Sequence, residues 1–298
     1  MITPEYLSKG DKIGIVATAR KIELNELTLA SQTFSDWGLE VVYGNHLFKE
    51  YNQFAGNDEE RIVDFQTMLN DATVKAIIFA RGGYGTVKIL DQIDWSGFIK
   101  NPKWLIGFSD LTCVHSHVFT NTKIETIHGI MPLNFDTASP ESIESLHKCL
   151  FGKPLKYEVK AHPFNRNGNA EGILIGGNLS LIHTLKGSKS DINTEGVILF
   201  LEDLDEYLYH IDRMMISLKR SGHLSKLAGL IIGGMTVMND NSIPFGETAY
   251  EIIRRTVADY NYPVCFGFPS GHFPDNRALI LGRKIKLIVG DNVTIDFN

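Results

Sequence analysis

Ser109 stands where an attacking hydroxyl would be well placed. It follows the apolar run 104–107 and precedes a segment with helical spacing. The free N–H groups of a helix N-terminus could hold the anion that forms when a hydroxyl attacks a carbonyl. However, Leu111 replaces the second glycine of the Gly-x-Ser-x-Gly motif, and serines at helix starts are more often caps. Taken alone, this segment favours a helix cap.

Glu202 and His272 are candidate partners for this hydroxyl. Glu202 ends the apolar run 197–201, so a buried strand would deliver its carboxylate to the edge of a sheet. The acidic residues that follow are typical of solvated surface, and a metal site is disfavoured because no compact set of histidines accompanies them. Among ten histidines, His272 differs only by its place in the Gly- and Pro-containing loop 267–272.

A glycine-rich segment, RGGYG at 81–85, follows the predicted strand 74–79, which is apolar except for Lys75. Glycines there permit close approach of the backbone to a ligand or an oxyanion. A phosphate cradle is the alternative, but the segment lacks both the Gly-Lys-Ser/Thr ending of a P-loop and the spacing of a dinucleotide-binding motif. A simple tight turn is a third interpretation, disfavoured by three glycines around one tyrosine.

The elements expected to position these residues form an α/β architecture. Apolar runs alternate with amphipathic stretches in the first half, which predicts a mostly parallel sheet with flanking helices. Strands are predicted at 13–17, 39–43, 74–79 and 104–107, and helices at 24–37 and 59–69. Because ligands bind at the carboxyl ends of such strands, segment 81–85 and Ser109 should lie on one edge of the sheet.

The second half resumes a similar pattern after a segment from about 134 to 169 that loses this rhythm. Strands are predicted at 173–178, 197–201 and 227–232, a helix at 209–219, and an antiparallel hairpin at 284–297. We therefore expect an N-terminal α/β domain at 1–140, a connecting segment at 141–169 and a C-terminal α/β domain at 170–298. The nucleophile would lie in the first domain, and the glutamate and histidine in the second.

Composition excludes several classes of protein. The 298 residues carry a formal net charge of −6 with no run of Lys and Arg, so nucleic acid is not an expected partner. No apolar run approaches the length that spans a bilayer, and the first residues lack the pattern of a signal peptide, so we expect a cytoplasmic protein. Three widely separated cysteines suggest neither a disulfide framework nor a zinc site.

Five motifs together resemble the LD-carboxypeptidase family of serine peptidases, which includes muramoyl-tetrapeptide carboxypeptidases and microcin C self-immunity peptidases. They are RGGYG at 81–85, GFSDLT at 107–112, GGNL at 176–179, LED at 201–203 and GH at 271–272. Each motif is weak alone, but their common order and similar spacing are specific and cover nearly the whole chain. The segment ATAR at 17–20 departs from the proline and serine that many members have after the first strand.

The resemblance implies a catalytic site between the two domains. Its residues would be a triad of Ser109, Glu202 and His272, oxyanion-hole N–H groups near Gly83 and of Asp110, and substrate contacts from Arg81 and Tyr84. It also implies a small barrel-like sheet in the C-terminal domain and a homodimer. Neither a metal nor a cofactor is expected.

The implied reaction is removal of the terminal D-alanine from a murein tetrapeptide during cell-wall recycling, by hydrolysis of an L,D-peptide bond. An immunity-type peptidase that cuts a peptidyl-nucleotide with the same triad is one alternative. A non-catalytic α/β protein that binds a small ligand is another, in which segment 81–85 and Ser109 hold an anion.

Overall fold

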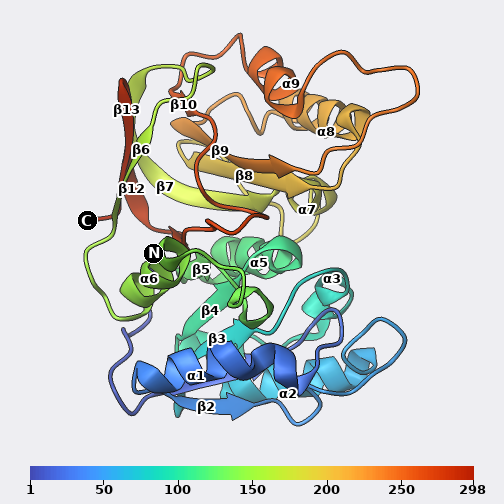
Figure 1. The fold of residues 1–298 in the computed structure, drawn as a ribbon, viewed down its shortest axis with the longest axis vertical. Coiled ribbons are helices and arrows are strands. Elements are labelled where there is room, and N and C mark those ends of the chain that lie inside the picture. The colour runs from blue at the N-terminus through green and yellow to red at the C-terminus, as the bar shows by residue number, and fades with distance from the viewer.

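Two separate sheets organise the chain, one built mainly from its first half and the other from its second (Figure 1). The computed structural model describes residues 1–298. The first sheet has the strand order β11-β5-β4-β3-β1-β2, and all its neighbouring pairs are parallel except β11 with β5. The predicted mostly parallel sheet is therefore confirmed.

The elements of the first half agree closely with the sequence pattern. Its strands are β1 (Lys12–Val16), β2 (Glu40–Tyr43), β3 (Val74–Phe79), β4 (Trp104–Gly107) and β5 (Thr126–His128), and its helices are α1 (Thr28–Asp36), α2 (Asp58–Asn70), α3 (Thr86–Ile89), α4 (Ser96–Lys100) and α5 (Thr112–Thr122). Strands β3 and β4 match their predicted bounds because both are buried and apolar except for the partly buried Lys75 in β3. Helix α2 begins after Asn57, which exchanges side-chain and backbone hydrogen bonds with Glu60 in a capping box.

The second sheet is open and mixed, with the order β10-β9-β8-β7-β12-β13-β6. Its strands are β6 (Lys156–Lys160), β7 (Gly168–Asn178), β8 (Ile198–Leu204), β9 (Gly229–Thr236), β10 (Val264–Cys265), β12 (Lys284–Val289) and β13 (Asn292–Asp296). Because β10 and β6 do not pair, the predicted barrel-like sheet is not a closed barrel. The predicted C-terminal hairpin is present as β12 and β13.

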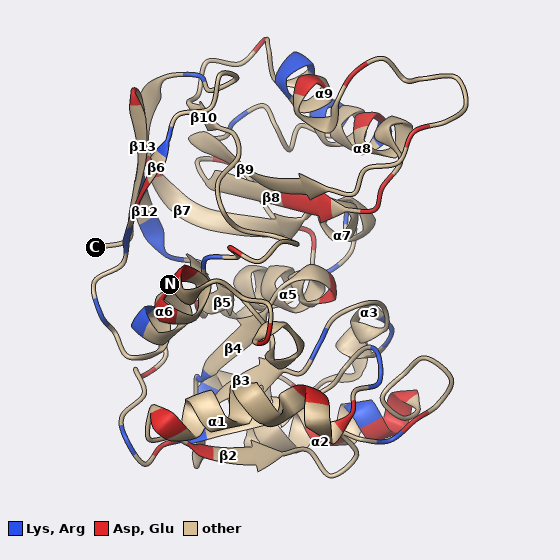
Figure 2. Ribbon diagram, viewed as in Figure 1, with Lys and Arg blue, Asp and Glu red and all other residues tan.

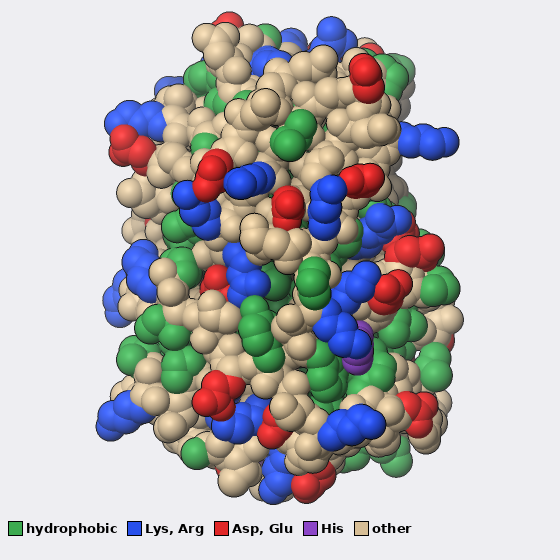
Figure 3. Space-filling view, turned by 90° about the vertical axis from the view of Figure 1, so that its left-hand side faces the viewer, with side chains coloured by type: hydrophobic (Ala, Val, Ile, Leu, Met, Phe, Trp, Pro, Cys, Tyr) green, Lys and Arg blue, Asp and Glu red, His purple; other side chains and the backbone are tan.

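The helices of the second half are α6 (Pro140–Leu150), α7 (Leu179–Thr184), α8 (Leu208–Arg220) and α9 (Ala249–Thr256). Helices α8 and α9 lie together on one side of the second sheet, and α5 lies between the two sheets (Figure 1). No helix is both long and apolar enough to cross a lipid bilayer. On the face shown in Figure 3, Lys and Arg side chains are interspersed with Asp and Glu side chains.

One strand from the second half of the chain joins the first sheet. Strand β11 (Leu279–Leu281) comes from the C-terminal part of the sequence but pairs with β5 of the first sheet. Helix α6 and strand β6 lie in the segment without sequence rhythm, where α6 begins at Pro140 after Ser139, whose hydroxyl accepts the Ser142 N–H. A buried apolar cluster of 40 residues runs through both halves, so the two sheets share one core.

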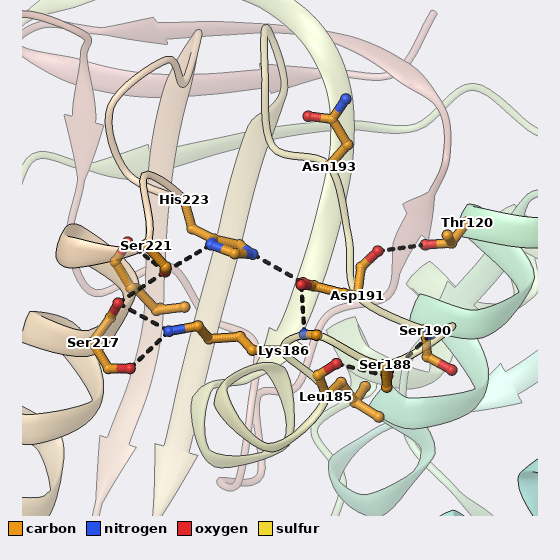
Figure 4. A network of polar contacts seen from close by, with 12 residues as sticks. Thr120, Leu185, Lys186, Ser188, Ser190, Asp191, Asn193, Ser217, Ser221 and His223 are labelled. Carbon is orange, nitrogen blue, oxygen red and sulfur yellow. Dashed lines mark hydrogen bonds and ion pairs between the residues drawn. The ribbon is translucent and has the colours of Figure 1, made fainter.

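A polar network also joins α5 to the loop after α7 (Figure 4). The Thr120 hydroxyl donates to the Asp191 carbonyl at 3.3 Å, and the Asn121 amide donates to the Lys189 carbonyl at 3.0 Å. His223 Nε2 lies 2.9 Å from the Asp191 carboxylate. Because α5 begins just after Ser109, this network fixes the helix behind Ser109 against the second half of the chain.

This network contains a hydrogen-bonded Ser-His-Asp chain, in which His223 lies between Ser221 and Asp191 (Figure 4). The Ser221 hydroxyl donates to the Ser217 carbonyl one turn back in α8, at 2.8 Å. Its hydrogen is therefore used to cap the end of α8. Lys186 also donates to the Ser217 carbonyl, so these hydrogen bonds together stabilise the C-terminus of α8.

Candidate active site

Ser109 occupies a sharp turn between β4 and α5. Its φ is +63°, a left-handed conformation that residues other than glycine seldom adopt. The cap position of the following turn is Phe108, and no side chain caps either that turn or α5. The helix-cap interpretation is therefore wrong. A strained serine between a strand and a helix has the geometry of a nucleophile elbow, despite Leu111 in place of the second glycine.

The glycine-rich segment lies against this turn. A Cβ atom on Gly82 would stand only 3.2 Å from Ser109 Cβ and 3.4 Å from its Oγ. Gly83 has φ +119°, where a side chain would be strained. The prediction that segment 81–85 and Ser109 meet at one edge of the first sheet is therefore confirmed.

The Asp110 side chain joins these two segments. Asp110 is 1% exposed, and its Oδ2 accepts the Thr86 N–H at 2.9 Å. Burial raises the pKa of this carboxyl, whereas hydrogen bonds from Thr86 and from the Gly85 N–H act in the opposite direction. The bond fixes the backbone of Asp110 relative to segment 81–85. The two expected oxyanion-hole segments therefore hold each other in place.

Glu202 and His272 form a direct pair. His272 Nδ1 lies 2.6 Å from Glu202 Oε2, and the carboxylate is completely buried at the carboxyl end of β8. Figure 2 shows acidic residues at this end of β8. Gly271 permits the close approach, since a Cβ there would lie 3.0 Å from Glu202 Oε2 and its φ is +128°. Glu202 Oε1 is buried without a hydrogen-bond partner, so the contact with His272 is the one side-chain hydrogen bond of this carboxylate.

The charge of His272 depends on this pairing. Burial lowers the pKa of His272, but attraction to Glu202, their hydrogen bond and the nearby Asp203 raise it, and the net result is a pKa above 6.5. The pKa of Asp203 is itself raised to about 7 by burial and by Glu202. Two adjacent acids beside a half-buried imidazole therefore favour its protonated form.

The GGNL motif connects the two halves at this point. The Asn178 N–H donates to Thr112 Oγ1 at 3.0 Å, and its side-chain amide donates to Asp203 Oδ1 at 2.8 Å. A Cβ atom on Gly177 would lie 2.5 Å from Thr112 Oγ1, so only glycine fits this contact. The start of α5 and the carboxyl end of β8 are thus held in a fixed relation.

Ser109 and His272 line one cavity of about 450 Å³ between the two halves. The structure gives no hydrogen bond between the two side chains, and such contacts often form only when a substrate closes the site. Arg81 and Gly83 also line the cavity. Tyr84 lies outside it, 51% exposed beside Phe54.

Sequence reasoning missed several residues of this cavity, notably Arg20, Asn134 and Glu206. Arg20 follows β1, so the rule that ligands bind at the carboxyl ends of parallel strands could have identified it. Asn134 lies in an irregular segment and carries no such signal.

The structure provides neither a cluster of metal ligands nor a reactive thiol. No group of three or more His, Cys, Asp or Glu side chains is placed to hold a metal ion. All three cysteines are buried, and burial raises the pKa of Cys149 and of Cys265 to about 12. Thiols with such pKa values are poor nucleophiles at neutral pH.

Comparison with known proteins identifies the family of the chain. A family model for the LD-carboxypeptidase N-terminal domain matches residues 13–129, and one for the LD-carboxypeptidase C-terminal domain matches residues 171–287. The probable murein peptide carboxypeptidase of Bacillus subtilis is 33% identical, over 98% of this chain and 93% of that protein.

Two solved structures share the fold over almost the full length. Muramoyltetrapeptide carboxypeptidase from Oxalobacter formigenes has a TM-score of 0.88 at 25% identity, covering 96% of this chain and 98% of that one. The microcin C7 self-immunity protein MccF, in complex with aspartyl sulfamoyl adenosine, has a TM-score of 0.89 at 21% identity, covering 100% and 98%. From the two family models and the full-length similarity to the Bacillus subtilis protein, this chain belongs to the LD-carboxypeptidase family.

Proposed function

We propose that this protein is a serine-type L,D-carboxypeptidase that removes the terminal D-alanine from murein tetrapeptides. Ser109 is the nucleophile, His272 the general base and Glu202 the group that orients the base. The observation that carries the proposal is one cavity containing both a serine in a strained elbow and a histidine paired with a buried glutamate. The names of the relatives in Bacillus subtilis and Oxalobacter formigenes support the substrate class.

The mechanism follows from the protonation of His272. With Nδ1–H donated to Glu202, Nε2 is free to accept the Ser109 proton as Oγ attacks the scissile carbonyl carbon. The backbone N–H groups of Gly83 and Asp110 would hold the resulting oxyanion. The imidazolium then gives its proton to the departing D-alanine nitrogen, which leaves an acyl-enzyme. His272 next takes a proton from water as the water oxygen attacks the ester carbon. The imidazolium then returns this proton to Ser109 Oγ as the bond to the acyl carbon breaks and the shortened peptide leaves.

The direct test is incubation of the protein with a murein tetrapeptide, followed by mass analysis. We expect release of free alanine and a tripeptide product, and neither product from Ser109→Ala. A parallel reaction contains a peptidyl-nucleotide, the substrate of the immunity-type alternative. Cleavage of the peptidyl-nucleotide in preference to the tetrapeptide would overturn the assigned substrate, and cleavage of neither would overturn the assigned activity.

The pH dependence of kcat/KM should reveal the His272–Glu202 pair. The general base acts as neutral imidazole, and the raised pKa of His272 keeps it protonated to a higher pH than the usual 6.5. We therefore expect the acid limb of the kcat/KM profile above pH 6.5, as measured on the free enzyme. A limb below that value would contradict the pairing. The same shift stabilises the fold below the unfolded histidine pKa, and this contribution is lost as pH rises through the folded-state pKa.

Asp110→Asn should lower kcat by about 100-fold, because small displacements of oxyanion donors have effects of this size. The amide retains one acceptor but directs its own NH₂ toward segment 81–85, where Thr86 and Gly85 offer N–H donors. Steady-state kinetics of this variant and of Asp91→Asn, an exposed acid of the same half, would check the effect. Equal, near-wild-type kcat values would show that Asp110 does not position the oxyanion hole.

Chelators and thiol reagents should leave most of the activity intact. The proposed mechanism uses neither a metal nor a cysteine, and the three thiols are buried. Rates measured after treatment with EDTA or iodoacetamide would check this. Strong inhibition by EDTA that zinc reverses would contradict the serine mechanism.

We also propose a cytoplasmic location and a homodimer. The location is supported by three unpaired cysteines, which are typical of a reducing compartment. The dimer is supported by the family resemblance, and sedimentation of the purified protein would test it.

A further inference from the structure

Two arginines in the active-site cavity lack a carboxylate partner. Arg20 and Arg81 both line this cavity, and neither forms an ion pair. One nitrogen of Arg81 donates to the Lys21 carbonyl at 3.2 Å, while its Nε is buried without a hydrogen-bond partner. Burial lowers the pKa of Arg81, nearby Glu26 raises it and Arg20 lowers it. Two like charges held close together, neither of them in an ion pair with a carboxylate, favour an anion between them.

The position of Arg20 relative to Ser109 determines how far from the nucleophile a bound anion would lie. The Arg20 side chain lies across Gly83, where a Cβ atom would stand 2.6 Å from Arg20 Cδ and 2.8 Å from its Nε. The preceding Gly82 is in turn packed against Ser109. Arg20 is therefore separated from the nucleophile by two residues without side chains, and it borders the expected oxyanion-hole N–H of Gly83.

This spacing fits a leaving group of one residue. Successive residues in a peptide are about 3.8 Å apart, so the terminal carboxylate lies within about one residue length of the last peptide carbonyl. A carbonyl placed for attack by Ser109 would therefore bring that carboxylate within the reach of an arginine side chain resting on Gly83. A peptide that continued beyond this residue would instead present an uncharged amide to the two guanidinium groups.

The acidic residues of the cavity do not occupy this anion position. Asp205 and Glu206 line the cavity from the loop after β8. Asp205 Oδ1 accepts from the Asn239 amide at 2.8 Å, and Glu206 Oε2 lies 2.8 Å from His210 Nδ1. Both carboxylates are thus engaged by their own half of the chain. The cavity has a cationic wall on the N-terminal side and an acidic wall on the C-terminal side.

We propose that Arg20, with Arg81 beside it, binds the C-terminal carboxylate of the peptide and so restricts hydrolysis to the last peptide bond. A guanidinium suits this role because its N–H groups can bind both carboxylate oxygens at once. Arg20 lies in the segment 17–20, where this chain departs from the pattern of many family members. The inference rests on the proposed function and names the part of the substrate that this site recognises.

Binding to the inactive Ser109→Ala protein tests the inference without turnover. Calorimetry would compare a murein tetrapeptide with its C-terminal amide, which lacks the negative charge. We expect the free acid to bind about 10- to 100-fold more tightly, because hydrogen bonds between charged groups contribute on this scale. Adding Arg20→Met should remove most of this preference, and Arg20→Lys should restore part of it. The control Arg220→Met, an exposed arginine at the end of α8, should leave the preference unchanged.

Equal binding of the acid and the amide would overturn the inference, as would an undiminished preference in Arg20→Met. Hydrolysis by the protein with an intact Ser109 separates this result from the proposed function. If the acid is preferred through Arg20 but never cleaved, the proposed activity fails while the carboxylate site stands. If the peptide is cleaved and Arg20→Met retains the full preference for the acid in kcat/KM, the activity stands and the role of Arg20 fails.

Discussion

Ser109→Ala should abolish nearly all hydrolysis of the tetrapeptide while leaving the fold intact. Loss of the nucleophile in a serine triad lowers kcat by about 10⁶-fold, with the remaining rate coming from oxyanion stabilisation and binding. Stability should change by less than about 0.5 kcal/mol, because Ser109 caps no helix and alanine removes only a hydroxyl. Single-turnover kinetics together with thermal unfolding would measure both quantities.

Ser242→Ala provides the control for this variant. Ser242 is exposed in the loop between β9 and α9, far from the cavity residues in the sequence, and its replacement should change neither rate nor stability. An active Ser109→Ala protein would remove Ser109 as the nucleophile. Unfolding of Ser109→Ala with normal activity per folded molecule would instead give Ser109 a purely structural role.

Glu202→Gln should lower kcat by about 10⁴-fold, as the corresponding change does in other serine triads. The amide can direct its NH₂ toward His272 and so favour the wrong tautomer, and it cannot stabilise the imidazolium. KM should change little, because Glu202 is buried behind His272 and does not line the cavity. Steady-state kinetics across a range of substrate concentrations would separate the two effects.

Glu125→Gln is the matched control, since Glu125 is also a buried glutamate and pairs with Arg283 away from the cavity. Its replacement should reduce stability but leave kcat near the wild-type value. If Glu202→Gln behaved like Glu125→Gln, His272 would have no orienting partner and the proposed triad would be incomplete.

Much of the scaffold was predictable from local sequence pattern. The strands 74–79 and 104–107 are apolar except for Lys75, so burial determines their bounds. By contrast, the pairing of β11 with β5 joins residues about half the chain apart, and only tertiary packing decides it. Helix α6 has capping residues at its start, Ser139 and Pro140, inside a segment whose overall composition resembles a loop.

The site was predictable in part. A serine after an apolar run is more often a helix cap than a nucleophile, and the sequence could not correct that preference because it does not reveal backbone dihedral angles. The φ of +63° at Ser109 decides against the cap. The contact between Glu202 and His272 spans 70 residues, and no local pattern could place it. Arg20 was missed although it follows β1, because a single arginine after a strand also has the sequence character of ordinary surface.

Labelling with a fluorophosphonate, which reacts with activated serines, tests the role of Ser109 most directly. After digestion of the labelled protein, mass spectrometry would identify the modified residue. We expect one modification per chain, located on Ser109, with labelling lost in Ser109→Ala and greatly slowed in His272→Ala. Labelling of a different serine, or no labelling of the folded protein, would contradict the assignment of Ser109 as the activated nucleophile.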